Sequence, residues 1–188
     1  MARLRSPEKR KAILEAAVLE IDAAGLSAPT SRIAARAGVA EGTLFTYFAN
    51  KDALLNELYL ELKVDVFRRL NAALDPDTSI KERACQIWTC YLDWAIEFPQ
   101  KRKVSVQLNM SNLISASTRE QVAAESGAVA ATLTELGKRA ADRGLPTEFA
   151  SACMSAMQEV AMDLIARQPE QRAELAKHAF ESFWRAVE

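Results

Sequence analysis

The chain has 188 residues, of which 49% are hydrophobic, and its formal net charge is −1. This length fits one large domain, or a small domain with a medium one, and the apolar share is enough for a buried core. The near-neutral total excludes a general nucleic-acid coat protein, but it hides an asymmetry, because residues 1–51 carry +3 and residues 52–188 carry −4. A basic end on an acidic body indicates an end that faces nucleic acid, although a solvated run of charges gives the same composition.

Cysteine and histidine usage limits the chemistry of the chain. Cys85, Cys90 and Cys153 show no C-x-x-C spacing, and His178 is the single histidine. This pattern predicts neither a zinc site nor a disulfide framework, and we expect no metal and no cofactor. No apolar run approaches the roughly 18 residues of a membrane span, and no signal-peptide core follows the basic N-terminus. The sequence therefore predicts a cytoplasmic protein, with His178 at the surface or at an interface.

Helical periodicity runs through nearly the whole chain, without strand alternation or an Asn-Gly hairpin signal, and predicts an all-α fold of about nine helices. The first helix has the clearest ends, with Ser6 as N-cap, Pro7 at the first helical position and Gly25 as the stop. The expected helices cover about residues 7–24, 30–37, 41–48, 51–74, 79–98, 100–114, 118–143, 147–167 and 169–188.

Residues 30–51, TSRIAARAGVAEGTLFTYFANK, carry the most informative pattern. Two short helical runs flank a tight turn at residues 37–39, and helices this short bury too little surface to fold alone. Their packing across a glycine turn is the pattern of a helix-turn-helix, whose second helix can enter a DNA major groove. The apolar faces of the two runs consist of Ile33, Ala34 and Ala37, and of Leu44, Phe45 and Phe48.

The N-terminal third resembles the TetR family of bacterial transcription regulators, over roughly residues 7–60. The remainder is similar only in being helical and of the right length. The resemblance implies a homodimer, usually a repressor, which a small molecule releases from a double-stranded DNA operator. It also implies a helix-turn-helix domain over residues 1–51 and a helical effector-binding and dimerisation domain over residues 52–188. The residues that carry the resemblance are the basic arm, Ile33-Ala34, Ala37-Gly38-Val39, Gly42-Thr43-Leu44-Phe45, Tyr47-Phe48 and Lys51.

Direct reading of bases uses side chains at the N-terminal end of the second helix of the motif. By position these are Glu41, Gly42 and Thr43. A carboxylate such as Glu41 can accept from a cytosine amino group, the methyl of Thr43 can touch that of thymine, and Gly42 allows close approach of the backbone. Negative charge at a helix N-terminus is favourable without any DNA, so both roles of Glu41 stay open.

Phosphate contacts are expected beside these residues. Thr30 and Ser31 begin the first helix of the motif, where hydroxyls and free N–H groups can hold a phosphate, although plain helix capping explains them equally well. The family resemblance implies further contacts to the DNA backbone from Thr46, Tyr47 and Lys51.

Phe45 departs from the family pattern, which often has tyrosine at this position. Phenylalanine cannot donate a hydrogen bond, so we expect Phe45 in the packing and the phosphate contact on Tyr47. In the basic arm, Arg3 and Arg5 can reach into a minor groove or meet phosphates.

The second half is expected to enclose the effector. Aromatic, methionine and amide side chains at helical spacing suit a pocket lining, although such stripes more often form simple core. Few charges occur among them, so we expect a neutral or apolar effector. The candidates are Trp88, Tyr91, Trp94, Gln107, Asn109, Met110, Asn112, Met154, Met157, Gln158 and Met162.

The last two helices are expected to form the dimer interface, because their apolar faces would be poorly solvated if exposed. Self-association into a four-helix interface would cover them, and packing onto the chain's own core is the alternative. The candidates are Phe149, Cys153, Ala156, Val160, Leu164, Leu175, Ala179, Phe180, Phe183, Trp184 and Val187.

Two other functions stay open. A helical enzyme would need a catalytic constellation, and the sequence has no Glu-x-x-His, no Ser/His/Asp arrangement and no phosphate loop, so we expect no enzyme. A protein-interaction module or ligand-binding bundle with a non-functional motif could use the same helices, but gains nothing general from the basic N-terminal end. Loss of DNA binding with rising salt distinguishes the alternatives, because it reports phosphate contacts.

Overall fold

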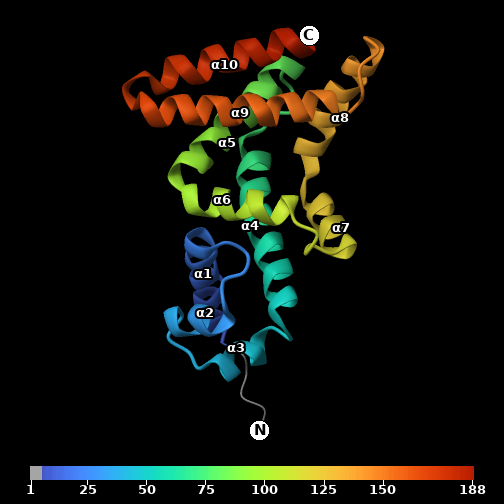
Figure 1. Ribbon diagram of the computed structural model, residues 1–188. Helices are drawn as coiled ribbons and strands as arrows, with labels where there is room; N and C mark the ends of the chain where they lie inside the picture. Colours follow the sequence, from blue (N-terminus) through green and yellow to red (C-terminus); the bar gives the residue numbers. More distant parts are fainter. Residues whose placement is uncertain (1–5) are drawn as a thin grey trace. The chain divides into compact units, whose positions relative to one another are not determined.

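Every regular element that the computed structural model describes, over residues 6–188, is helical (Figure 1). The all-α class expected from the sequence is therefore confirmed. None of these helices is long and apolar enough to cross a membrane. The elements are α1 (Pro7–Ala24), α2 (Thr30–Arg36), α3 (Glu41–Tyr47), α4 (Lys51–Ala73), α5 (Ile80–Glu97), α6 (Pro99–Met110), α7 (Ala116–Glu125), α8 (Gly127–Asp142), α9 (Phe149–Arg167), the 3-10 helix η1 (Pro169–Gln171) and α10 (Arg172–Val187).

The chain folds into two compact units. The N-terminal unit comprises the residues up to Val64 together with Phe98–Val122, and the C-terminal unit comprises Asp65–Glu97 together with Ala123–Glu188. Helices α4 and α7 supply residues to both units. The N-terminal unit is larger than the DNA-binding domain expected over residues 1–51, because it also includes the first part of α4, all of α6 and most of α7.

Helix α1 organises the N-terminal unit, and its ends follow local signals. Ser6 Oγ accepts a hydrogen bond of 3.3 Å from the backbone N–H of Lys9, Pro7 occupies the first helical position, and Gly25 ends the helix. These are the ends expected from the sequence, because capping chemistry depends only on neighbouring residues. The buried face of α1 includes Ile13, Leu14, Ala17 and Ile21.

Ion pairs join α1 to α4 and α6 within this unit. Arg10 on α1 pairs with Glu57 and, at 3.0 Å, with Glu61 on α4. Lys103 on α6 lies 2.8 Å from Asp22 near the end of α1. These groups are partly exposed, so each pair contributes at most about 1 kcal/mol. Their combined effect is to set the orientation of α1 against the two neighbouring helices.

Helix α6 ends at Met110, earlier than the expected end near residue 114. The loop that follows is held by α4, since the Asn56 side chain donates to the carbonyl of Leu113 and accepts from the N–H of Ser115, both at 2.9 Å. These bonds satisfy backbone groups that a longer helix would have satisfied internally. A partner so far away in sequence could not be recognised from local pattern.

The single helix expected over residues 118–143 is wrong, because the chain breaks between α7 and α8 at Ser126 and Gly127. Gly127 has φ 49°, a conformation that favours glycine. Asn71 of α4 fixes the break by donating to the carbonyl of Glu125 and accepting from the N–H of Val129, both at 3.2 Å. One asparagine therefore satisfies the end of one helix and the start of the next.

Aromatic packing organises the C-terminal unit. Trp88 on α5 stacks on Phe183, with ring centroids 6.1 Å apart, and meets Phe180 edge-on at 5.8 Å. Its indole N–H donates to the carbonyl of Ala176 at 3.1 Å. Helices α9 and α10 pack along one another, joined by η1 (Figure 1). Helix α10 thus directs its large aromatic side chains into the core of its own unit.

Candidate nucleic-acid interface

Helices α2 and α3 form the helix-turn-helix. Gly38 makes the turn at φ 69°, and the N–H of Val39 donates to the carbonyl of Ala34 at 3.0 Å, which closes the end of α2. Leu44 and Phe48 are buried at 0% and 1% exposure. One face of α3 is therefore fixed by packing, while much of the remaining surface of this helix is open to solvent.

A buried carboxylate of α1 fixes α2. Glu20 is only 3% exposed, and its oxygens lie 3.0 Å from Arg32 and 2.6 Å from Arg36. The hydrogen bond from Arg36 lowers the pKa of Glu20 below its ordinary value, although burial opposes this. A carboxylate at such depth requires charged partners. The sequence signal was an acid three residues after Ala17, on the apolar face of α1, and our sequence analysis missed it.

The first residues of α2 and α3 bond to each other. Thr30 Oγ1 donates to Glu41 Oε1 at 2.6 Å, and Pro29 rather than Thr30 occupies the N-cap position. Capping therefore does not explain Thr30. Glu41 is exposed and keeps its second carboxylate oxygen available as an acceptor. Ser31 is also exposed, beside Thr30.

The surface of α3 is most open at Gly42. A Cβ placed there would meet no atom within 4 Å, so a DNA backbone or base edge can approach the helix closely. Thr43 is half-buried, and its carbonyl accepts from Thr46 Oγ1 at 2.6 Å. The hydroxyl proton of Thr46 is thus already used within α3.

The expectation that Phe45 belongs to the packing is wrong. Phe45 is 42% exposed, whereas its neighbour Leu44 is fully buried. Helical spacing assigned both to one face, but a helix with only two turns has a narrow contact with its partner. An exposed ring on this helix can make apolar contact with a thymine methyl.

Tyr47 and Lys51 end the motif. The hydroxyl of Tyr47 accepts from the backbone N–H of Ser6 at 3.0 Å, which leaves its own proton free to donate. Lys51 is the first residue of α4, half-buried, and the structure shows no ion pair for it among the described residues. Arg3 and Arg5 lie outside the described residues.

The expected pocket residues fall into both compact units. In the C-terminal unit Trp88, Trp94, Met154, Gln158 and Met162 are buried, and Tyr91 and Met157 are half-buried. Several of them belong to the core, since Trp88 stacks on Phe183 and the Trp94 indole donates to Asp65 at 3.3 Å. In the N-terminal unit Gln107 is half-buried, whereas Asn109, Met110 and Asn112 are exposed.

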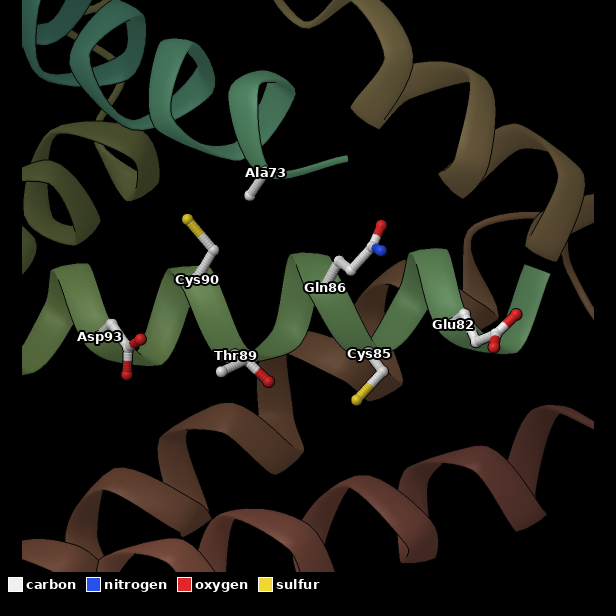
Figure 2. Close-up of a pocket in the computed structure, with 7 residues that line it drawn as sticks. All are labelled: Ala73, Glu82, Cys85, Gln86, Thr89, Cys90 and Asp93. Carbon is white, nitrogen blue, oxygen red and sulfur yellow. The ribbon is translucent and has the colours of Figure 1, made fainter. Parts of the chain in front are cut away.

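Two hollows lie along α5 in the C-terminal unit. The first, of about 560 Å³, is apolar and carries two thiols. Figure 2 shows Cys90 and Gln86 pointing toward Ala73 at the end of α4, while Cys85 and Thr89 point to the other side of α5. The second hollow, of about 740 Å³, includes Trp88 and continues over α10. The lining residues that the sequence analysis missed are Ala73, Glu82, Cys85, Gln86, Thr89, Cys90 and Asp93.

The thiol of Cys90 is not poised for reaction. Burial, followed by the nearby charge of Asp93, raises its pKa above the ordinary value. The protonated thiol is neither a good nucleophile nor a good metal ligand. The described residues also contain no cluster of histidine, cysteine and carboxylate side chains that could hold a metal ion.

The expected dimer residues divide between surface and core. On α9, Ala156 and Val160 are exposed, the latter by 49%, and Phe149, Cys153 and Leu164 are half-buried. On α10, Leu175 is half-buried. The remaining candidates are buried against their own chain, which is the alternative that the sequence left open for them: Ala179, Phe180, Phe183, Trp184 and Val187. His178 is exposed, as expected for a surface histidine.

Comparison with known proteins assigns this architecture. Residues 13–58 match the model of bacterial regulatory proteins of the tetR family. The HTH-type transcriptional regulator BetI of Escherichia coli O17:K52:H18 is 30% identical, over 74% of this chain and 86% of BetI. The HTH-type regulator YhgD of Bacillus subtilis is 27% identical over 57% of this chain, which spans about half of YhgD, at 54%.

A solved structure extends the similarity to the whole chain. The crystal structure of a TetR family regulator from Shewanella sp. PV-4 has a TM-score of 0.79 and 29% identity, and the match covers 97% of this chain and 98% of that one. The match includes the C-terminal helices, for which the sequence pattern alone showed only helical character. The chain therefore belongs to the TetR family of bacterial DNA-binding transcription regulators.

Proposed function

We propose that the protein is a homodimeric repressor that binds a near-palindromic operator and leaves it when a small molecule binds. The observation that carries the proposal is the open N-terminal end of α3. Glu41 and Gly42 are exposed there, while Leu44 and Phe48 fix the helix from its buried side. A helix held in this way can enter a major groove without losing its own packing.

Specificity and affinity come from different residues of this surface. The free oxygen of Glu41 accepts from a base amino group, and the methyl of Thr43 contacts thymine. Tyr47 and Lys51 donate to phosphates, because one has a free hydroxyl proton and the other an unpaired charge. Thr30, Ser31, Thr46 and the arm residues Arg3 and Arg5 complete the proposed contacts.

Dimerisation presents two such helices to one face of DNA. The exposed apolar residues of α9, including Ala156 and Val160, supply a surface that a second copy would cover. Two copies related by a two-fold axis read two half-sites, so the operator is expected to be a near-palindrome. DNA as the target places the protein in the cytoplasm.

Release by an effector needs a connection between the bound molecule and α3. Helix α4 supplies residues to both compact units, and its first residue is the proposed phosphate contact Lys51. Within the N-terminal unit, α6 is joined to α1 by Lys103 and Asp22. Movement of α4 or α6 when the effector binds would thus change the position of α3.

Footprinting of purified protein on DNA selected from random sequence tests the proposal. We expect one discrete protected near-palindrome at moderate salt, and a steep loss of affinity as salt rises. Lys51→Ala should weaken binding to all sequences and reduce the salt slope by about 1, whereas Glu41→Gln should change the preferred base. Lys138→Ala removes the same charge from the exposed surface of α8 and serves as control. Absence of any discrete site would contradict specific repression.

A further inference from the structure

Two cations of the N-terminal unit share one aromatic ring and have no acidic partner. Lys63 Nζ on α4 lies 5.5 Å from the ring centroid of Tyr59, and Arg119 Cζ on α7 lies 5.9 Å from the same centroid. Among the described residues, no carboxylate forms an ion pair with either cation. An aromatic face attracts each charge but does not neutralise it.

Hydrogen bonds hold the other members of this cluster in place. The hydroxyl of Tyr59, which is 3% exposed, donates to Asn109 Oδ1 at 2.7 Å. Arg119 donates from one terminal nitrogen to the carbonyls of Asn109 and Ser111, both at 3.2 Å. Among the described residues, the amide nitrogen of Asn109 and the other guanidinium nitrogens of Arg119 have no hydrogen-bond partner. The cluster therefore presents cationic and neutral donors, and none of the described residues adds a carboxylate to it.

Several other cations of the unit have acidic partners. Arg10 has two glutamates, Arg32 and Arg36 share Glu20, and Lys103 has Asp22. At Lys63, burial and then the positive charge of Arg119 lower the pKa of the ammonium group. Lys63 is half-buried and Arg119 is exposed, and a partly buried charge near a second charge of the same sign is a cost to the folded protein. An external anion would remove that cost.

We propose that Lys63 and Arg119 bind the anionic group, a carboxylate or a phosphate, of the small molecule that regulates the protein. Arg119 supplies the N–H donors that the two carbonyls do not use, Lys63 supplies a point charge, and Asn109 adds an amide donor. The regulatory role rests on the proposed function, whereas binding of the anion does not. The proposed effector is thus anionic, whereas the sequence analysis expected a neutral or apolar one.

Thermal shift and calorimetry without DNA test the site. The probes are acetate, octanoate, inorganic phosphate and octyl phosphate, with octanol as the uncharged control. We expect wild-type protein to bind at least one anion ten times more tightly than Lys63→Met or Arg119→Gln does, and Lys63→Arg to retain most of the affinity. Comparison of octanoate with octyl phosphate separates a carboxylate from a phosphate ligand. Lys101→Met is the matched control, since Lys101 also lies over an aromatic ring, 4.7 Å from that of Phe98.

A second readout separates ligand binding from a structural role. Lys63→Met should raise the melting temperature of the free protein, because it removes an uncompensated half-buried charge, whereas loss of a stabilising lysine would lower it.

Two results overturn the proposal. One is equal stabilisation of wild type and of the double variant Lys63→Met/Arg119→Gln by every anion, and the other is no stabilisation of wild type by any of the four. If an anion binds at this site but operator DNA stays bound, the site stands and release by an effector is wrong.

Discussion

Gly42 shows how a single residue can favour function over folding. Glycine inside a helix costs roughly 1 kcal/mol relative to alanine, and α3 has only 7 residues over which to recover that cost. No atom lies within 4 Å of the position that a Cβ would occupy. The packing of the protein therefore gives no reason for glycine here, and the close approach of DNA proposed above would give one.

Gly42→Ala is expected to raise the free energy of unfolding by about 0.5–1 kcal/mol and to weaken operator binding. Denaturant titration and DNA binding measure the two effects separately. Gly144→Ala is the control, because that position is equally open but has φ 77°, so alanine should cost roughly 1–2 kcal/mol and leave DNA affinity unchanged. Unchanged operator binding by Gly42→Ala would contradict close approach.

Glu20 carries the second prediction at this scale. Its pKa in the folded protein is below the ordinary 4.5, so its ion pairs stabilise the fold fully above that pH and lose this effect as pH falls through the folded pKa. Glu20→Gln should therefore lower the melting temperature at pH 7, and the difference from wild type should shrink under strongly acidic conditions. Thermal unfolding across this pH range checks both. A difference that is independent of pH would show that packing, not charge, explains the effect.

At the scale of elements, the interior of α8 packs closely against the backbone of the segment that follows it. A Cβ at Gly137 would come within 2.6 Å of the carbonyl oxygen of Thr147. Backbone cannot yield as a flexible side chain can, so Gly137→Ala should destabilise the protein by about 1–3 kcal/mol. Denaturant titration measures the change in the free energy of unfolding. Gly42→Ala is the matched comparison, because that substitution is expected to raise the free energy of unfolding. Equal effects of the two substitutions would contradict this packing.

The elements that were predicted correctly are those whose signals are local. Ser6 and Pro7 define the start of α1 through adjacent backbone groups, and Thr30 and Glu41 begin the two helices of the motif as expected. The break before α8 could not be predicted, because the side chain that satisfies it belongs to α4. A helix end that adjacent residues determine can be predicted from the sequence, whereas one that depends on a side chain of a distant helix cannot.

The candidate sites follow the same division. The order of residues in α3 indicates which of them can read DNA, since the motif is short and its geometry is fixed. Tyr59 and Lys63 are four residues apart on one face of α4, but their meeting with Arg119 depends on how α4 and α7 pack, and no sequence pattern links the two helices. Apolar stripes on α10 were equally ambiguous, because core and dimer interface require the same periodicity.

For the whole molecule, the exposed apolar surface of α9 makes assembly testable. Val160→Glu places a charge on this surface and should yield monomers at micromolar concentration, with weaker operator binding. Sedimentation measures the state, and the melting temperature of wild type should rise with protein concentration. Ala131→Glu, at an exposed position of α8, is the control. A wild-type monomer, or an unchanged dimer of Val160→Glu, would contradict the proposed interface.

The open position at Gly42 also makes α3 a suitable place to change the base preference of the protein by substitution. Because a Cβ at this residue would meet no neighbouring part of the chain within 4 Å, we expect other side chains to be accepted here. Substitution by each amino acid in turn would thus give a set of proteins with one scaffold and different base preferences. Selection of preferred sites from random DNA for each variant would identify the base pair that faces residue 42. Substitutions at this one position could then be used to change the operator that the protein binds.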